Sequence, residues 1–195
     1  MKYFAITPDE LSPVALGRYL PVLQRCSVNY LYLRAQSLHA ELEQLVALIR
    51  QHAIMPIIPR GLHQAPFTSA CGMHTRSNEH FKARLNPSGV LQTAACHSTE
   101  AACTLLDNGA DYVFISPVYR PFSKSGDMRP LIEINTLRML TRRYGERIVL
   151  LGGLTPQRID ELGTLLDDDF SIGGISMFFT TGTTDGNGSP ADIRQ

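Results

Sequence analysis

Short runs of apolar residues alternate along this chain with longer stretches in which apolar residues recur every three or four positions. The short runs are typical of strands and cover residues 2–7, 29–35, 55–60, 89–96, 111–119, 147–153 and 170–179. The longer stretches have the spacing of amphipathic helices and cover residues 13–26, 38–52, 98–108, 131–144 and 156–166. Because a crossover between parallel strands needs a helix, this alternation predicts an α/β fold with a parallel sheet.

Residues that favour helix ends stand at the expected places. Ser98 can cap the helix that Gly109 closes, and Thr155 can cap the last helix, with Pro156 at its first position. The strand-like runs are almost continuously apolar, which indicates that both faces of the sheet are covered. The pattern fits either an open doubly wound sheet or a closed (β/α)8 barrel, and we favour the barrel.

Two stretches interrupt the alternation. Residues 61–88 are rich in polar and turn residues, with only Gly-Met-His at 72–74 as a possible short strand. After Phe179 the chain is too poor in apolar residues to form a packed eighth helix. We therefore expect one barrel domain over residues 1–180, with reduced helices around 61–88, a weak or missing eighth helix and a mostly disordered tail over 181–195.

Composition and charge exclude several classes of partner. The 195 residues carry 18 basic and 18 acidic side chains, so the zero net charge gives no reason to expect a nucleic-acid or membrane-surface partner. The N-terminus has no apolar segment of the kind that directs secretion, and no apolar run is long enough to span a bilayer. The four cysteines form no CxxC pair, so we expect free thiols in a cytoplasmic protein.

The residues that could bind or react with a ligand lie where the predicted strands end. Parallel α/β folds bind their ligands at this end of the sheet. The polar and glycine residues at these ends are Arg34, Arg60, His74, Thr75, Arg76, Cys96, His97, Ser123, Lys124, Gly152 and Gly153. Several cations and a glycine pair at one mouth predict a site for a phosphorylated ligand. Each arginine alone could equally form a surface ion pair, and His74 and His97 could equally be buried core residues.

Several segments resemble, in the same order, the thiamin phosphate synthase and thiazole tautomerase (TenI-like) family. They are YLR (32–34), IIPR (57–60), GMH (72–74), ACHSTEAA (95–102), GADYVFISPVYRPFSKSG (109–126) and LLGGLTPQRIDEL (150–162). The resemblance covers most of residues 2–180. It implies a TIM (β/α)8 barrel and a transferase of thiamin biosynthesis. The family's reaction joins hydroxymethylpyrimidine diphosphate to thiazole phosphate and releases pyrophosphate.

The resemblance also implies roles for individual residues. Arg34 and Arg60 match arginines of the diphosphate site. Ser123 and Lys124 match a Thr-Lys phosphate loop, and Gly152-Gly153 matches glycines whose backbone holds the thiazole phosphate. Histidine is the side chain best suited to shuttling a proton at neutral pH, so His97 or His74 could serve in an isomerase. The candidate catalytic residues are thus Lys124 and His97, and the candidate substrate- and phosphate-binding residues are Arg34, Arg60, His74, Ser123, Lys124, Gly152 and Gly153.

The chain departs from the family pattern where magnesium would bind. Pro59 stands at the position of a magnesium-binding aspartate, and Ile58 at that of the neighbouring asparagine. Neither side chain can bind the ion, which prefers carboxylate and water oxygens. Glu79 is then the one candidate carboxylate for a magnesium ion. Tyr32 and Gln36 also replace the family's Gln and Lys beside the strand-two arginine.

These departures leave three functions open within the family and one outside it. The first is a divergent thiamin phosphate synthase, with small phosphorylated thiamin precursors as partners. The second is a metal-independent thiazole phosphate tautomerase, although Pro117 stands where that branch has a histidine. The third is a non-catalytic or regulatory binder of a precursor, and the last is an unrelated phosphate-binding barrel. Near the last strand, the position of a family serine is taken here by Phe179 or Thr180. A barrel that lacks its eighth helix would also expose apolar surface on its outside, so we expect a homodimer.

Overall fold

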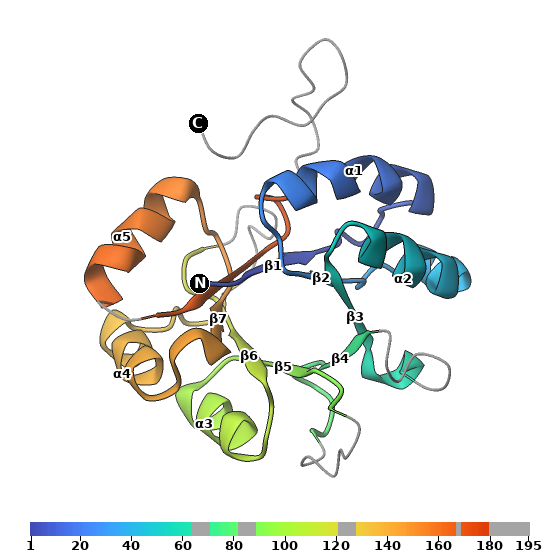
Figure 1. Cartoon of the computed structure of the whole chain (residues 1–195). Coiled ribbons are helices and arrows are strands. Elements are labelled where there is room, and N and C mark those ends of the chain that lie inside the picture. The colour runs from blue at the N-terminus through green and yellow to red at the C-terminus, as the bar shows by residue number, and fades with distance from the viewer. Residues whose placement is uncertain (64–70, 82–88, 121–127, 167–168, 180–195) are drawn as a thin grey trace.

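Eight parallel strands close into a barrel in the computed structural model, which describes residues 1–63, 71–81, 89–120, 128–166 and 169–179 (Figure 1). The strands are β1 (Tyr3–Ile6), β2 (Tyr30–Tyr32), β3 (Met55–Pro59), β4 (Gly72–Thr75), β5 (Gln92–Cys96), β6 (Tyr112–Ile115), β7 (Ile148–Leu150) and β8 (Ser171–Gly174). Each strand pairs with its neighbours in chain order, and Tyr3 opposite Ile172 closes the ring between β1 and β8. This confirms the predicted TIM barrel, with β4 as a full member, and excludes the open sheet.

Helices cover the outside of the barrel unevenly. The α-helices are α1 (Pro13–Arg25), α2 (Leu42–Gln51), α3 (Thr99–Asp107), α4 (Ile134–Tyr144) and α5 (Pro156–Leu166), and the short 3-10 helices are η1 (Gln36–Glu41), η2 (Arg60–Leu62) and η4 (Gly145–Arg147). In Figure 1, α1 and α2 lie beside β1–β3, and α3, α4 and α5 lie beside β5–β8. Within the described part of 61–88, the helical structure is limited to η2, as the sequence predicts.

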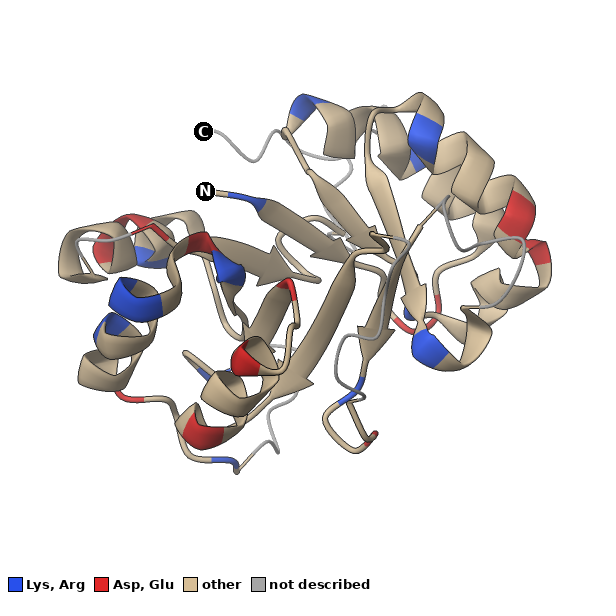
Figure 2. Ribbon diagram, turned by 60° about the horizontal axis from the view of Figure 1, so that its bottom comes forward, with Lys and Arg blue, Asp and Glu red and all other residues tan. Residues whose placement is uncertain are grey.

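The barrel interior is filled from its N-terminal end. None of the eight strands contains a Lys, Arg, Asp or Glu, and charged residues lie on the helices and loops (Figure 2). Phe4, on β1, stacks on Tyr30 with ring centroids 4.4 Å apart and meets Phe114 edge-on at 5.2 Å. Because these rings fill the half of the barrel interior near the N-terminal ends of the strands, the remaining space lies toward the C-terminal ends.

The main error of the sequence prediction lies at β8. The apolar run 170–179 predicts one long strand, but the strand ends at Gly174. The chain then turns, with the N–H groups of Phe178 and Phe179 both donating to the carbonyl of Ile175. Both phenylalanines are buried, and Phe179 meets Tyr19 of α1 with ring centroids 5.0 Å apart. The run is apolar because the turn is part of the core.

The described residues also show where the fourth helix begins, the state of the cysteines and how long the apolar helices are. The fourth helix begins at Ile134, later than predicted, because Glu133 is its N-cap in extended conformation. All four cysteines are free, as predicted. No helix in the described part of the chain is long and apolar enough to cross a membrane. The predicted tail, 181–195, lies outside the described residues.

Candidate active site

A cavity of about 660 Å³ opens at the C-terminal ends of the strands. Its floor is made by side chains from four strands: Ile6, Tyr32, His74 and Phe114. Its walls come from the loops that follow β1, β2, β4, β5, β6, β7 and β8. The cavity therefore occupies the place where the sequence predicts a ligand site.

His74 is at once a buried residue and part of the cavity floor. Its ring lies between those of Tyr32 and Phe114, at centroid distances of 4.4 Å and 5.1 Å. Its Nδ1 lies 2.8 Å from the Thr93 hydroxyl. Burial, with a smaller contribution from the nearby Arg76 charge, lowers the pKa of His74 to about 3. The imidazole is therefore neutral at physiological pH. His74 is buried, as one interpretation of the sequence has it, and its role in binding a ligand stays a prediction.

One wall of the cavity carries two arginines and an aspartate: Arg34, Arg76 and Asp9, which we call the Arg34 end. Arg34 follows β2, where the Thr7 hydroxyl accepts a hydrogen bond of 2.9 Å from its backbone N–H. Its Nη2 lies 2.9 Å from Asp9 Oδ1, whereas its Nε is buried and has no hydrogen-bond partner among the described residues. An unpaired buried donor of this kind is suited to an anion.

The opposite wall carries two glycines in backbone conformations that other residues rarely adopt. Gly152 and Gly153 follow β7 with φ of +105° and +60°. A Cβ on Gly152 would stand 3.1 Å from Pro117 Cα, and one on Gly153 would overlap the carbonyl group of Arg120. Both positions therefore require glycine, and the turn leads directly into the N-terminus of α5, where backbone N–H groups favour anions.

His97 and Arg129 lie beside this glycine turn, and with Gly152, Gly153 and Ser176 they form what we call the Gly152 end. His97 Nδ1 lies 2.8 Å from the Ser116 carbonyl oxygen, and Arg129 Nη1 lies 2.8 Å from His97 Nε2. Arg129 Nη1 also lies 2.9 Å from His97 Nδ1, so the guanidinium lies against the imidazole ring at the cavity wall.

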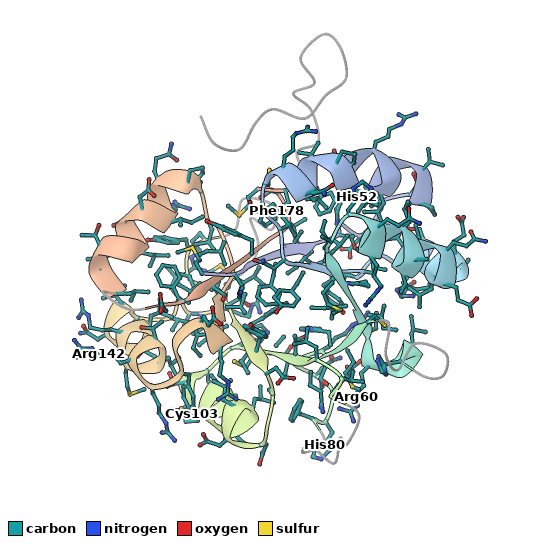
Figure 3. All side chains as sticks on the ribbon, in the orientation of Figure 1. His52, Arg60, His80, Cys103, Arg142 and Phe178 are labelled. Atoms are coloured by element: carbon teal, nitrogen blue, oxygen red, sulfur yellow. The ribbon has the colours of Figure 1, made fainter. Side chains whose placement is uncertain are left out.

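The structure brings together some of the site residues that the sequence predicts and separates others. The residues that line the cavity are Arg34, His74, His97, Gly152 and Gly153. Arg60 does not line it: Arg60 lies by η2 outside the ring of strands (Figure 3), and its Nη1 is 3.4 Å from Thr75 Oγ1. The expectation that Arg60 points into the cavity is wrong because η2 begins directly after β3 and turns the residue outward. Ser123 and Lys124 lie outside the described residues.

The described residues do not fit a carboxylate-built magnesium site. Pro59 is buried in β3, and its side chain has no atom that could bind a metal ion. Glu79 lies on the exposed loop after β4, where its carboxylate accepts a 2.9 Å hydrogen bond from the Arg76 N–H, and it does not line the cavity. Asp9 is paired with Arg34. Across the described part of the chain, no group of three or more His, Cys, Asp or Glu residues could hold a metal ion.

Sequence reasoning missed two polar residues of the Gly152 end. Ser176 lines the cavity but lies inside the apolar run 170–179, where no turn was predicted. The family serine was matched instead to Phe179, which is buried in the core, or to Thr180, which lies outside the described residues. Arg129 lies in the long loop between β6 and α4, and nothing in its spacing indicated that it reaches His97.

Cys96 ends β5 close to the cavity but is not a nucleophile of the site. The side chain is 3 % exposed, and burial raises the pKa of its thiol to about 12. It therefore remains protonated at physiological pH.

Comparison with known proteins identifies one family. The family described as thiamine monophosphate synthase matches residues 15–177. A thiamine-phosphate synthase of Methanocella arvoryzae is 24% identical over 164 residues, which cover 80% of this chain and 74% of that protein.

Two solved structures share the fold. A thiamine phosphate pyrophosphorylase from Pyrococcus furiosus superposes with a TM-score of 0.66 and 18% identity, over 90% of this chain and 86% of that one. A thiamine phosphate pyrophosphorylase from Bacteroides thetaiotaomicron gives 0.61 and 18%, over 90% and 82%.

Proposed function

Because this chain belongs to the thiamine monophosphate synthase family of thiamin-biosynthetic enzymes, we propose that it is a divergent thiamin phosphate synthase. Its substrates would be hydroxymethylpyrimidine diphosphate and thiazole phosphate, and its products thiamin phosphate and pyrophosphate. The observation that carries the proposal is the pair of anion-suited walls on opposite sides of one cavity.

The position of the two walls follows from the closed strand order. The Arg34 end is built after β1, β2 and β4, and the Gly152 end after β5, β6, β7 and β8, so they lie on different halves of the ring. Between them lies a floor of three rings, Tyr32, His74 and Phe114. A single phosphorylated ligand needs one such wall, whereas two ligands whose phosphates must stay apart need both.

The proposed reaction assigns one ligand to each wall. The bond between the pyrimidine methylene carbon and the diphosphate oxygen breaks, and pyrophosphate leaves with the electron pair. Arg34 and Arg76 stabilise the negative charge that develops on it, an effect that is strong in a partly dehydrated site. The thiazole nitrogen then forms a bond to the methylene carbon, while the Gly152 end holds the thiazole phosphate in position.

Magnesium would supply further charge neutralisation to such a reaction. Since the described residues offer no carboxylate cluster for magnesium, no step of the proposed reaction depends on the ion. Positive charge at this wall comes instead from Arg76, which directly follows β4 and lies next to the buried Tyr32.

A thiazole phosphate tautomerase is the second candidate, and His97 favours it. The side chain lines the cavity, and its Nε2 would be free to accept a proton if a phosphate drew Arg129 away. This function needs the Gly152 end alone and leaves Arg34 and Arg76 without a role. A non-catalytic binder would use the same wall without turnover.

Calorimetric titration with pyrophosphate and with thiazole phosphate, with and without magnesium, tests the two-wall proposal. Charge-assisted hydrogen bonds contribute about 1.5–3 kcal/mol, so each loss should weaken binding about ten- to a hundredfold. Arg34→Ala should weaken pyrophosphate, Arg129→Ala should weaken thiazole phosphate, and Arg142→Ala on α4 should change neither. If Arg34→Ala affects neither ligand, the site takes one phosphate and the synthase proposal is wrong.

A further inference from the structure

Two hydrogen bonds between Arg76 and Glu79 close a short turn directly after β4. The Arg76 N–H donates to Glu79 Oε2 at 2.9 Å, and the Glu79 N–H donates to the Arg76 carbonyl oxygen at 3.0 Å. Both the side chain and the backbone of Glu79 are thus bonded to the same residue. Arg76 lines the cavity, whereas Glu79 does not. The turn therefore presents its guanidinium, and not its carboxylate, to the cavity.

The Arg76 guanidinium lies at the Arg34 end of the cavity. A hydrogen bond with the hydroxyl of the buried Tyr32 is the main influence that raises the pKa of Arg76. Burial raises the pKa of Tyr32, and the charges of Arg76 and Arg34 both oppose this effect. The Arg76 charge also adds to the effect of burial in lowering the pKa of His74. Two guanidinium groups therefore act on the same part of the cavity.

The carboxylates that the described residues place near these arginines already have partners. Asp9 Oδ1 lies 2.9 Å from Arg34 Nη2, and Glu79 holds the Arg76 turn. Pro59 ends β3, the strand between β2 and β4, and has no side-chain atom that binds a metal. A divalent cation at this end would also be repelled by both guanidinium groups. The arrangement therefore fits an anion and does not fit a magnesium ion.

We propose that Arg76 takes the place of a magnesium ion at the Arg34 end, so that a diphosphate binds there without the metal. The inference rests on the proposed function and adds to it the residue that balances the diphosphate charge. Arg34 and Arg76 bind the diphosphate oxygens through charge-assisted hydrogen bonds. Glu79 is then a positioning residue, which acts by holding the turn that carries Arg76.

Magnesium in solution should then leave pyrophosphate binding unchanged or weaken it. The ion binds phosphate oxygens and so lowers the negative charge of pyrophosphate. A ligand of lower charge is attracted less strongly by two guanidinium groups. A site that holds the metal through protein carboxylates would respond in the opposite direction, because the ion would join the ligand to the protein. The sign of the magnesium effect therefore separates the two kinds of site.

Glu79 variants separate positioning from metal binding. Glu79→Gln keeps an oxygen that can accept a hydrogen bond from the Arg76 N–H, whereas Glu79→Ala removes it. Positioning predicts that Glu79→Ala weakens pyrophosphate binding about threefold with or without magnesium, because the turn is no longer held in place. Glu79→Gln should bind pyrophosphate at least as tightly as the unaltered protein. A metal ligand would instead show a loss in Glu79→Gln that appears only in the presence of magnesium.

The test titrates the full chain and its variants with inorganic pyrophosphate, with and without magnesium. The unaltered protein should bind free pyrophosphate at least as tightly as pyrophosphate in magnesium solution. Arg76→Ala should bind free pyrophosphate about tenfold more weakly. Arg76→Lys should recover part of this loss, because it keeps the charge but not the planar pair of donors. Arg142→Ala, on α4 outside the cavity, is the control and should bind as the unaltered protein does.

Two kinds of result overturn the inference in distinguishable ways. If magnesium strengthens pyrophosphate binding to the unaltered protein, or if Arg76→Ala binds as tightly as Arg142→Ala, Arg76 does not replace the ion. The proposed function then still stands, because pyrophosphate binds. If pyrophosphate binds in neither condition, the synthase proposal and the inference are both wrong. The magnesium comparison on the unaltered protein does not depend on the folding of any variant.

Discussion

Gly153 illustrates how one residue of the cavity wall is fixed by its surroundings. Its φ of +60° lies in the left-handed region, and an added Cβ would stand 2.9 Å from the carbonyl carbon of Arg120. Arg158 of α5 donates a hydrogen bond to the Gly153 carbonyl, while its guanidinium lies 4.6 Å from the centre of the Tyr119 ring. The turn is therefore held by the loop after β6 on one side and by α5 on the other.

Gly153→Ala should lower the free energy of unfolding by about 2–3 kcal/mol, because strained backbone and overlap with the Arg120 carbonyl add to each other. Chemical denaturation measures the change. Gly163→Ala is the control, since Gly163 lies in α5 with nothing within 4 Å of an added Cβ. It should stabilise the protein by about 0.5–1 kcal/mol. Equal effects of the two substitutions would contradict the geometry described for the turn.

His74 should make stability depend on pH. Its pKa is about 3 in the folded protein and 6.5 in the unfolded chain. Between these values the unfolded chain binds a proton that the folded protein does not, so stability falls as the pH drops from about 6.5 to about 3.

The measurement is the pH dependence of the unfolding free energy of the unaltered protein and of His74→Asn. The variant should show a slope that is smaller by up to about 1.4 kcal/mol per pH unit in this window. His80→Asn, the same substitution at an exposed position, is the control. Parallel pH profiles for the unaltered protein and His74→Asn would show that His74 is not buried as a neutral group.

Among the helices, the ends marked by a capping residue agree with the sequence prediction. The last helix has the predicted bounds, Pro156–Leu166, because Thr155 and Pro156 mark its start. Ser98 caps α3 as predicted, with its hydroxyl accepting from the Ala101 N–H at 3.2 Å. Strand ends were less predictable, since the turn at Ile175 is as apolar as β8 itself.

Ser98→Ala should lower the free energy of unfolding by about 1 kcal/mol, because the Ala101 N–H loses its capping partner. Thr104→Ala, at an exposed position within the same helix, is the control. It removes no cap and should leave stability unchanged or slightly higher. Thermal or chemical denaturation of the two variants compares them directly. A loss in Thr104→Ala as large as in Ser98→Ala would contradict the capping role.

At the scale of the whole molecule, closure of the barrel could not be derived from the alternation alone, because open and closed sheets share it. The family resemblance supplied that step. The sequence predicted only in part which strand-end residues line the cavity. Arg34 lines it, whereas Arg60 does not, because η2 follows β3 without a loop. The Arg129–His97 contact joins loops after β6 and β5, and local spacing carries no information about such a pair.

The homodimer stays a prediction. Phe178 and Phe179 already cover part of α1 at the place where an eighth helix would pack. The described residues thus have less apolar surface at this point than the sequence led us to expect.

In the proposed function, two phosphorylated ligands occupy opposite walls of one cavity and are joined there. The most direct test incubates the full chain with hydroxymethylpyrimidine diphosphate and thiazole phosphate, with and without magnesium, and quantifies all products by chromatography. Thiamin phosphate and pyrophosphate should form in equal amounts, only when both substrates are present, and Arg34→Ala should slow the reaction. Isomerised thiazole phosphate in the absence of the pyrimidine, or no product from either substrate, would contradict the account.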